Sequence, residues 1–158
     1  MGNHINGKKN AVSIVFLDVD GVLNSHGNVS IEVKKLELLK QIIDKTNAKI
    51  VISSTWRNKT HYLHKLKKAL SKHDMQFIDC TPNFHALRSP EQNRINEIKL
   101  WLNRREHDSI YLITNWIAID DLNLLKYDKK LMSNHFVNTK PNLGLTQENV
   151  NYAIQLLN

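Results

Sequence analysis

The sequence predicts a three-layer α/β domain built on a central parallel sheet. Short apolar runs alternate with longer segments in which apolar residues recur at helical spacing. Several of these runs end directly in carboxylates or hydroxyls, as strands of a parallel sheet do where their carboxyl ends open onto a ligand crevice. With 158 residues, of which 41% are hydrophobic, the chain is long enough to form one core.

The first half of the chain predicts three strands and two helices. Residues 11–17 form an apolar run typical of a buried strand, and the hydroxyl of Ser30 is a suitable cap for the helix that follows. The predicted elements are, in order, a strand at 11–17, a helix from 30 to 43, a strand at 48–52, a helix at 62–70 and a short edge strand at 75–79.

Two further helices and a short strand are predicted in the second half. Pro90 suits the first turn of a helix that ends near Arg104, after a loop at 82–89. A short strand at 136–137 precedes a closing helix at 146–157. Alternating strands and helices imply right-handed crossovers between neighbouring parallel strands.

One more strand is predicted between these helices, and the sequence pattern leaves two possible starting points for it. Residues 109–113 are apolar enough for a strand, but Thr114 and Asn115 interrupt the pattern. We therefore expect the functional strand to span 116–120.

Two pairs of aspartates follow predicted strands. Asp18 and Asp20 precede Gly21 after the first strand, and Asp120 and Asp121 end a later one. Carboxylates held this close repel one another unless a cation or a shared proton lies between them. Because Mg²⁺ prefers oxygen ligands, the two pairs predict a magnesium site. Taken alone, the stretch from Asp18 to Gly21 is also compatible with an ordinary turn.

Polar groups suited to phosphate follow the strand at 48–52. Ser53 and Ser54 supply hydroxyls, and Arg57 supplies a guanidinium just beyond them. Such groups bind phosphate oxygens. A serine-rich turn explains the hydroxyls as well, and a structural salt bridge is the alternative for Arg57.

These motifs resemble those of the haloacid-dehalogenase-like (HAD) phosphatases, and most closely the HAD-type domains of RNA repair proteins. The resemblance extends through the whole chain. It rests on Asp18-x-Asp20, on Ser53 within Ser-Ser-x-Trp-Arg, on Arg94 within Arg-x-x-Glu-Ile-x-x-Trp-Leu, on Asp120-Asp121 and on Gly144-Leu145-Thr146. It implies a Rossmann-like fold and the hydrolysis of phosphomonoesters with Mg²⁺ as cofactor.

The resemblance also implies a role for each site residue. Asp18 would attack phosphorus to form an aspartyl-phosphate, and Asp20 would act as the acid and then the base. The carboxylates of Asp18 and Asp121 and the backbone carbonyl of Asp20 would hold Mg²⁺, while Asp120 would bind it through water or orient its neighbour. Ser53 and Arg94 would bind the transferring phosphoryl group; Arg88 and Lys99 are the alternatives to Arg94.

The partner is expected to be a phosphorylated macromolecule. Neither loop in which HAD enzymes carry a cap domain has room for one, and capless members commonly act on macromolecular phosphate. Residues 57–73 hold many Lys, Arg and His residues and no acid, which indicates either polyanion binding or a solvated helix face. A polynucleotide-end phosphatase, a phosphoprotein or phosphotyrosine phosphatase, and a catalytically dead nucleic-acid-binding module therefore remain alternatives.

Composition sets the remaining expectations. Residues 1–10 are polar and basic, so we expect a flexible tail followed by one phosphatase domain at 11–158. No apolar stretch is long enough to span a membrane. A single cysteine, Cys80, favours the cytoplasm or another reducing compartment, and we expect a monomer.

Overall fold

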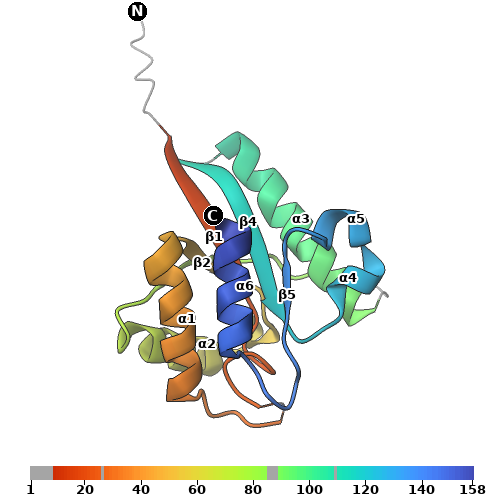
Figure 1. Ribbon diagram of the computed structural model, residues 1–158. Coiled ribbons are helices and arrows are strands. Elements are labelled where there is room, and N and C mark those ends of the chain that lie inside the picture. Colours follow the sequence, from red (N-terminus) through yellow and green to blue (C-terminus); the bar gives the residue numbers. More distant parts are fainter. Residues whose placement is uncertain (1–8, 26, 85–88, 109) are drawn as a thin grey trace, which may run out of the picture.

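Five parallel strands form the middle layer of the molecule. The computed structural model describes residues 9–25, 27–84, 89–108 and 110–158 (Figure 1). Within these residues, the strand order is β3-β2-β1-β4-β5, and every neighbouring pair is parallel. The strands are β1 (Asn10–Leu17), β2 (Lys49–Ile52), β3 (Phe77–Cys80), β4 (Tyr111–Asp120) and β5 (Phe136–Asn138). The predicted fold class and parallel sheet are thereby confirmed.

Helices cover both faces of this sheet. They are α1 (Val33–Thr46), α2 (Thr60–Ser71), α3 (Pro90–Asp108), α4 (Leu124–Tyr127), α5 (Lys129–Met132) and α6 (Gln147–Leu157), with a short 3-10 helix, η1 (Thr55–Asn58). Helices α1, α2 and α6 lie on one face, and α3, α4 and α5 lie on the other (Figure 1). The result is the three-layer arrangement that the sequence predicts.

Two hydrophobic cores hold the layers together. Successive residues of a strand point to opposite faces, so Leu17 joins the core beneath α1, α2 and α6, while Phe16 joins the core beneath α3. The Phe16 ring makes edge-to-face contacts with Trp101 and Trp116, at centroid distances of 5.3 and 5.7 Å. The end of β1 is therefore fixed on both sides.

Strand β4 is continuous, which corrects the expected interruption at Thr114 and Asn115. The pairing with β1 shifts register between Val12 and Ser13, so Thr114 is the extra residue of a bulge. The Thr114 hydroxyl donates to the Val12 carbonyl, and the Asn115 amide donates to the Leu156 carbonyl. Polar side chains are tolerated in the strand because these bonds satisfy them.

Helix α1 begins three residues later than predicted, again because of contacts outside the helix. Ser30 does not cap the helix, which begins at Val33 after Glu32 without a side-chain cap. Instead, the Ser30 amide donates to the Asn28 side chain, 2.9 Å away, in a local turn. The Glu32 amide donates to the Leu23 carbonyl, and this tertiary bond sets where the helix can begin.

The other differences are small. Strand β3 lies one to two residues later than predicted, α3 runs to Asp108, and η1, α4 and α5 were not predicted. Part of the predicted loop at 82–89 and most of the predicted tail at 1–10 lie outside the described residues.

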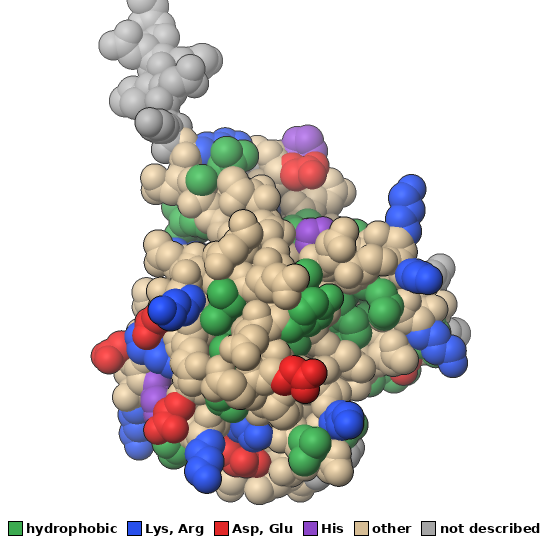
Figure 2. All heavy atoms as spheres, in the orientation of Figure 1, with side chains coloured by type: hydrophobic (Ala, Val, Ile, Leu, Met, Phe, Trp, Pro, Cys, Tyr) green, Lys and Arg blue, Asp and Glu red, His purple; other side chains and the backbone are tan. Residues whose placement is uncertain are grey.

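The surface carries a mixture of charges, with a net charge of +7 for the chain. On the face shown in Figure 2, Lys and Arg side chains stand among Asp and Glu side chains. The basic excess therefore does not form one continuous field on that face. Among the described helices, none is both long and apolar enough to cross a membrane.

Candidate active site

The fold brings the polar ends of three strands together at one edge of the sheet. In the register of the central strands, Leu17 of β1 pairs with Ile52 of β2 and Ile119 of β4. The ladder continues one residue further, because the Asp18 amide donates to the Ile119 carbonyl at 3.0 Å and the Ser53 amide donates to the Leu17 carbonyl at 2.8 Å. The residues that follow each strand are thus neighbours in space.

Three carboxylates converge at this edge. Oxygens of Asp18, Asp120 and Asp121 all lie within 4.8 Å of one another. Asp18 and Asp120 are only 5% and 2% exposed, whereas Asp121 is half-buried. Several carboxylates in so small and dry a volume need positive charge nearby to remain ionised together.

The close approach of Asp121 depends on a glycine. Gly21 has a positive φ of 73°, and a Cβ built on it would lie 2.3 Å from an Asp121 carboxylate oxygen. Any side chain at this position would displace the carboxylate or the turn. Hard oxygen donors in this arrangement suit Mg²⁺, so the residues present fit the predicted metal.

Arg94 of α3 supplies the positive charge beside the carboxylates. Its guanidinium donates to Asp120 and lies 3.5 Å from Asp18. Burial lowers the pKa of Arg94, but the carboxylates of Asp120, Asp18 and Glu97 more than offset this and hold it above the usual value. Burial also raises the pKa of Asp120, and Arg94 opposes that shift by favouring the ionised carboxylate.

Glu97 links Arg94 to a second arginine. Its carboxylate lies 3.8 Å from Arg94 Nε and 2.8 Å from a terminal nitrogen of Arg57, and it also accepts from the Phe84 amide. Arg57 further donates to the carbonyl of Ser54 and to the side chain of Asn83. Burial lowers the pKa of Arg57, and the charge of Glu97 opposes this shift.

The alternative cations are not brought to the carboxylates within the described residues. Lys99 points away from them and pairs with Asp128 at 2.7 Å on the protein surface. Arg88 lies outside the described residues. Arg94 is thus the predicted cation that the fold places beside Asp18.

The two serines that follow β2 differ in their contacts. Ser53 is 1% exposed, and its hydroxyl oxygen has no hydrogen-bond partner among the described residues. The Ser54 hydroxyl instead accepts from the Trp56 amide and caps η1. Burying a hydroxyl without a hydrogen-bond partner costs free energy, so Ser53 is the stronger candidate to bind an oxygen of the substrate phosphate. The roles of Ser54 and Arg57 in substrate binding stay predictions.

Asp20 lies apart from the three-carboxylate cluster. One of its oxygens accepts from the Asn24 amide and the other accepts from the Trp56 indole, both at 3.0 Å. The Asn24 side-chain oxygen in turn accepts from the Gly21 amide at 3.1 Å. The two aspartates of the first motif therefore have different partners, although one residue separates them.

The carboxyl-terminal segment holds the loop that carries these aspartates. The Thr139 hydroxyl donates to the Gly21 carbonyl at 2.7 Å, and the Leu145 amide donates to the Val22 carbonyl at 2.8 Å. Thr146 then caps α6 through a capping box with Asn149. The late Gly-Leu-Thr motif thus fixes the loop after β1 from outside.

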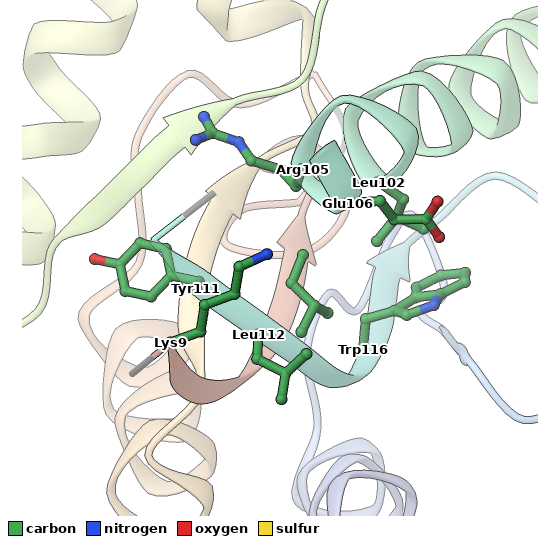
Figure 3. Close-up of a pocket in the computed structure, with 8 residues that line it drawn as sticks. Lys9, Leu102, Arg105, Glu106, Tyr111, Leu112 and Trp116 are labelled. Carbon is green, nitrogen blue, oxygen red and sulfur yellow. The ribbon is translucent and has the colours of Figure 1, made fainter. Parts of the chain in front are cut away.

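A separate pocket of about 380 Å³ lies at the opposite end of β4 (Figure 3). Its lining includes Lys9, Arg105, Tyr111 and Trp116, with Glu106 as its one carboxylate. Without a second carboxylate, this lining does not offer the metal-binding pair found at the other edge.

Comparison with known protein families identifies the chain. The model of the HAD domain in Swiss Army Knife RNA repair proteins matches residues 14–150. The chain belongs to this HAD family. The match spans the sheet and the residues of the candidate site, and it supports a hydrolase of the HAD type. No curated protein matches the sequence.

Sequence reasoning did not assign a role to three residues of this HAD site. Glu97 was visible only as part of the helical motif with Arg94, Trp56 only as part of Ser-Ser-x-Trp-Arg, and Asn24 only as a polar residue after the first motif. Their partners lie up to 40 positions away in the chain. Local spacing could not reveal those contacts.

We predict that Glu97→Gln lowers the free energy of unfolding by about 3 kcal/mol, because it leaves two buried guanidinium groups without a shared counter-charge. Urea denaturation measures this change. The control is Lys99→Gln, which breaks an exposed pair and should cost less than about 1 kcal/mol. Equal losses for the two variants would contradict the proposed importance of the buried network.

Proposed function

We propose that this HAD domain is a Mg²⁺-dependent phosphatase that hydrolyses phosphomonoesters through an aspartyl-phosphate on Asp18. One observation carries the proposal: Asp18, Asp120 and Asp121 converge beside Arg94 and the hydroxyl of Ser53, which has no hydrogen-bond partner among the described residues. Carboxylates with a cation and a free hydroxyl match the needs of a reaction that depends on positioning and charge stabilisation.

Two aspartates divide the chemical work. A carboxylate oxygen of Asp18 forms a bond to phosphorus while the bond to the leaving oxygen breaks, and Asp20 gives its proton to that oxygen. In the second step, Asp20 takes a proton from water, whose oxygen attacks phosphorus and releases Asp18. The separate hydrogen-bond partners of Asp20 support this division.

The metal would be held by Asp18, Asp121 and the backbone carbonyl of Asp20. Both oxygens of Asp120 already accept hydrogen bonds, one from Arg94 and one from the Leu122 amide, so we assign it an orienting role. When bound, Mg²⁺ supplies positive charge that relieves repulsion between the carboxylates and the phosphate.

Ser53 and Arg94 would bind the phosphoryl oxygens. The Ser53 hydroxyl can donate to a non-bridging oxygen, and Arg94 is held charged by the surrounding carboxylates. Arg57 and Ser54 would stabilise the phosphate-binding residues indirectly. Their described contacts are with Glu97, Asn83 and the backbone of η1.

We propose the phosphorylated end of a nucleic acid as the substrate. The family is described from RNA repair proteins. The chain passes from β1 to α1 within residues 18–32 and from β3 to α3 within residues 81–89, and connections this short support an open site without a cap domain. Exposed lysines of α2 would add electrostatic attraction for a polyanion.

Replacement of the nucleophile should abolish turnover while the fold is retained. Asp18→Asn keeps the shape but removes the attacking oxygen charge and a metal ligand, so kcat should fall by a factor on the order of 10⁴ or more. Hydrolysis of p-nitrophenyl phosphate measures it. Asp44→Asn, an exposed aspartate of α1, serves as the control and should retain full activity. Residual activity of Asp18→Asn within about tenfold of that of the parent protein would contradict the covalent mechanism.

Activity should also require a divalent cation. Without one, the clustered carboxylates repel both each other and the phosphate dianion, so EDTA should abolish turnover and added Mg²⁺ should restore it. Isothermal titration calorimetry should detect Mg²⁺ binding that Asp121→Asn weakens. Full activity in EDTA would place the chain outside this chemistry.

The lysines in and directly after α2 test the substrate class. Replacing Lys67 and Lys68 of α2, and Lys72 just after it, with Gln should weaken oligonucleotide binding and reduce its log–log salt slope by about one unit for each lost phosphate contact. The same triple change at Lys126, Lys129 and Lys130, on the opposite layer, is the control with matched charge.

Competition distinguishes the alternative substrate. Phosphorylated oligonucleotides and phosphopeptides are offered together at about 0.15 M salt, where exposed charges are partly screened. We expect the oligonucleotide to be dephosphorylated first. Preference for the phosphopeptide, with no inhibition by unphosphorylated DNA or RNA, would replace the nucleic-acid assignment with a phosphoprotein phosphatase.

A further inference from the structure

We propose that Trp56 is a positioning residue that, together with Asn24, holds the Asp20 carboxylate on the leaving-group side of the site. The inference rests on the proposed phosphatase function and deepens it. It explains how two aspartates separated by a single residue are assigned to different steps, which the spacing of the motif alone does not explain.

Both Asp20 oxygens are held by groups that only donate. The Trp56 indole nitrogen lies 3.0 Å from one oxygen, and an indole N–H has no acceptor capacity. The Asn24 amide nitrogen lies 3.0 Å from the other oxygen. The orientation of Asn24 is fixed, because its own oxygen must accept from the Gly21 amide. Asp20 is therefore clamped from two sides.

Trp56 is itself held rigidly. It is 3% exposed, its backbone amide donates to the Ser54 hydroxyl, and its ring stacks on Tyr62 at a centroid distance of 4.9 Å. Asn24 is fully buried. Donors that cannot move hold an acceptor more precisely than flexible surface groups do.

The clamp separates Asp20 from the carboxylate cluster. Asp18, Asp120 and Asp121 gather beside Arg94, whereas both Asp20 oxygens face Trp56 and Asn24. Each carboxyl oxygen has two lone pairs, so the bond from Trp56 leaves a position free for the transferred proton. Without the indole donor, Asp20 can rotate toward the positive charge at the cluster and away from the leaving oxygen.

Kinetics with two leaving groups test this role. Trp56→Phe keeps an aromatic ring but removes the donor, so kcat for glycerol 3-phosphate, which needs acid assistance, should fall by about tenfold or more. For p-nitrophenyl phosphate, whose phenolate leaves readily, the loss should stay below about threefold. The matched control is Trp101→Phe, which keeps an aromatic ring against Phe16, removes only an indole donor to Asp79 away from the carboxylates, and should change neither rate.

A double-mutant cycle then asks whether Trp56 acts through Asp20. In the Asp20→Asn background, Trp56→Phe should cause little further loss, because the positioned acid is already gone. Equal losses for both leaving groups, or an undiminished effect in the Asp20→Asn background, would show that Trp56 is merely structural and would overturn the inference.

An NMR measurement tests the clamp independently of catalysis. The chain has three tryptophans, so Trp56→Phe assigns the Trp56 indole resonance. Asp20→Ala should move this resonance toward the position of a free indole, while that of Trp101 stays unchanged. An unmoved Trp56 resonance would refute the clamp.

The two proposals can fail separately. If the parent protein hydrolyses neither phosphate ester, the proposed function is wrong, but the Trp56 resonance still shows whether Trp56 holds Asp20.

Discussion

Repulsion among carboxylates at the ends of β1 and β4 is the constraint around which this edge of the molecule is organised. Carboxylate oxygens of Asp18, Asp120 and Asp121 lie within 4.8 Å of one another, and Asp18 and Asp120 are almost fully buried. Such groups stay ionised only if positive charge is built in beside them. Arg94 provides this positive charge, and the carboxylates in turn keep the pKa of Arg94 above its usual value.

This requirement connects the site to the helix layer. Arg94 extends from α3 to the ends of the strands, and Glu97, one turn later, joins it to Arg57 of η1. The position of α3 is therefore tied to the site by charge as well as by the packing of Trp101 against Phe16. A single network of buried ions spans β1, β4, α3 and η1, so a change at one member alters the surroundings of the others.

The first motif shows how the same side chain acquires two environments. Asp18 lies in the charged cluster, while Asp20 lies between neutral donors from Asn24 and Trp56. Gly21 follows directly after Asp20, and because it has no Cβ, the Asp121 carboxylate can approach the turn closely. Differences of this kind set acid and nucleophile apart in sites that contain several carboxylates.

The fold class and the residues at the strand ends follow from the amino-acid sequence alone. Buried parallel strands consist of apolar runs, and their carboxyl ends meet at one edge of the sheet. The sequence pattern therefore already places Asp18, Ser53, Asp120 and Asp121 close together. Arg94 was chosen over Lys99 and Arg88 from its place in a family motif, and the fold puts it beside Asp18.

The surroundings of those residues, in contrast, depend on tertiary contacts. The bulge at Thr114 and the late start of α1 depend on bonds to Val12 and Leu23, which local propensity does not register. Helices α4 and α5, at four residues each, are too short to form from intrinsic preference and depend on packing. Likewise, Glu97 and Trp56 gain their roles from partners distant in the chain, because charge balance and hydrogen bonding depend on separation in space rather than in sequence.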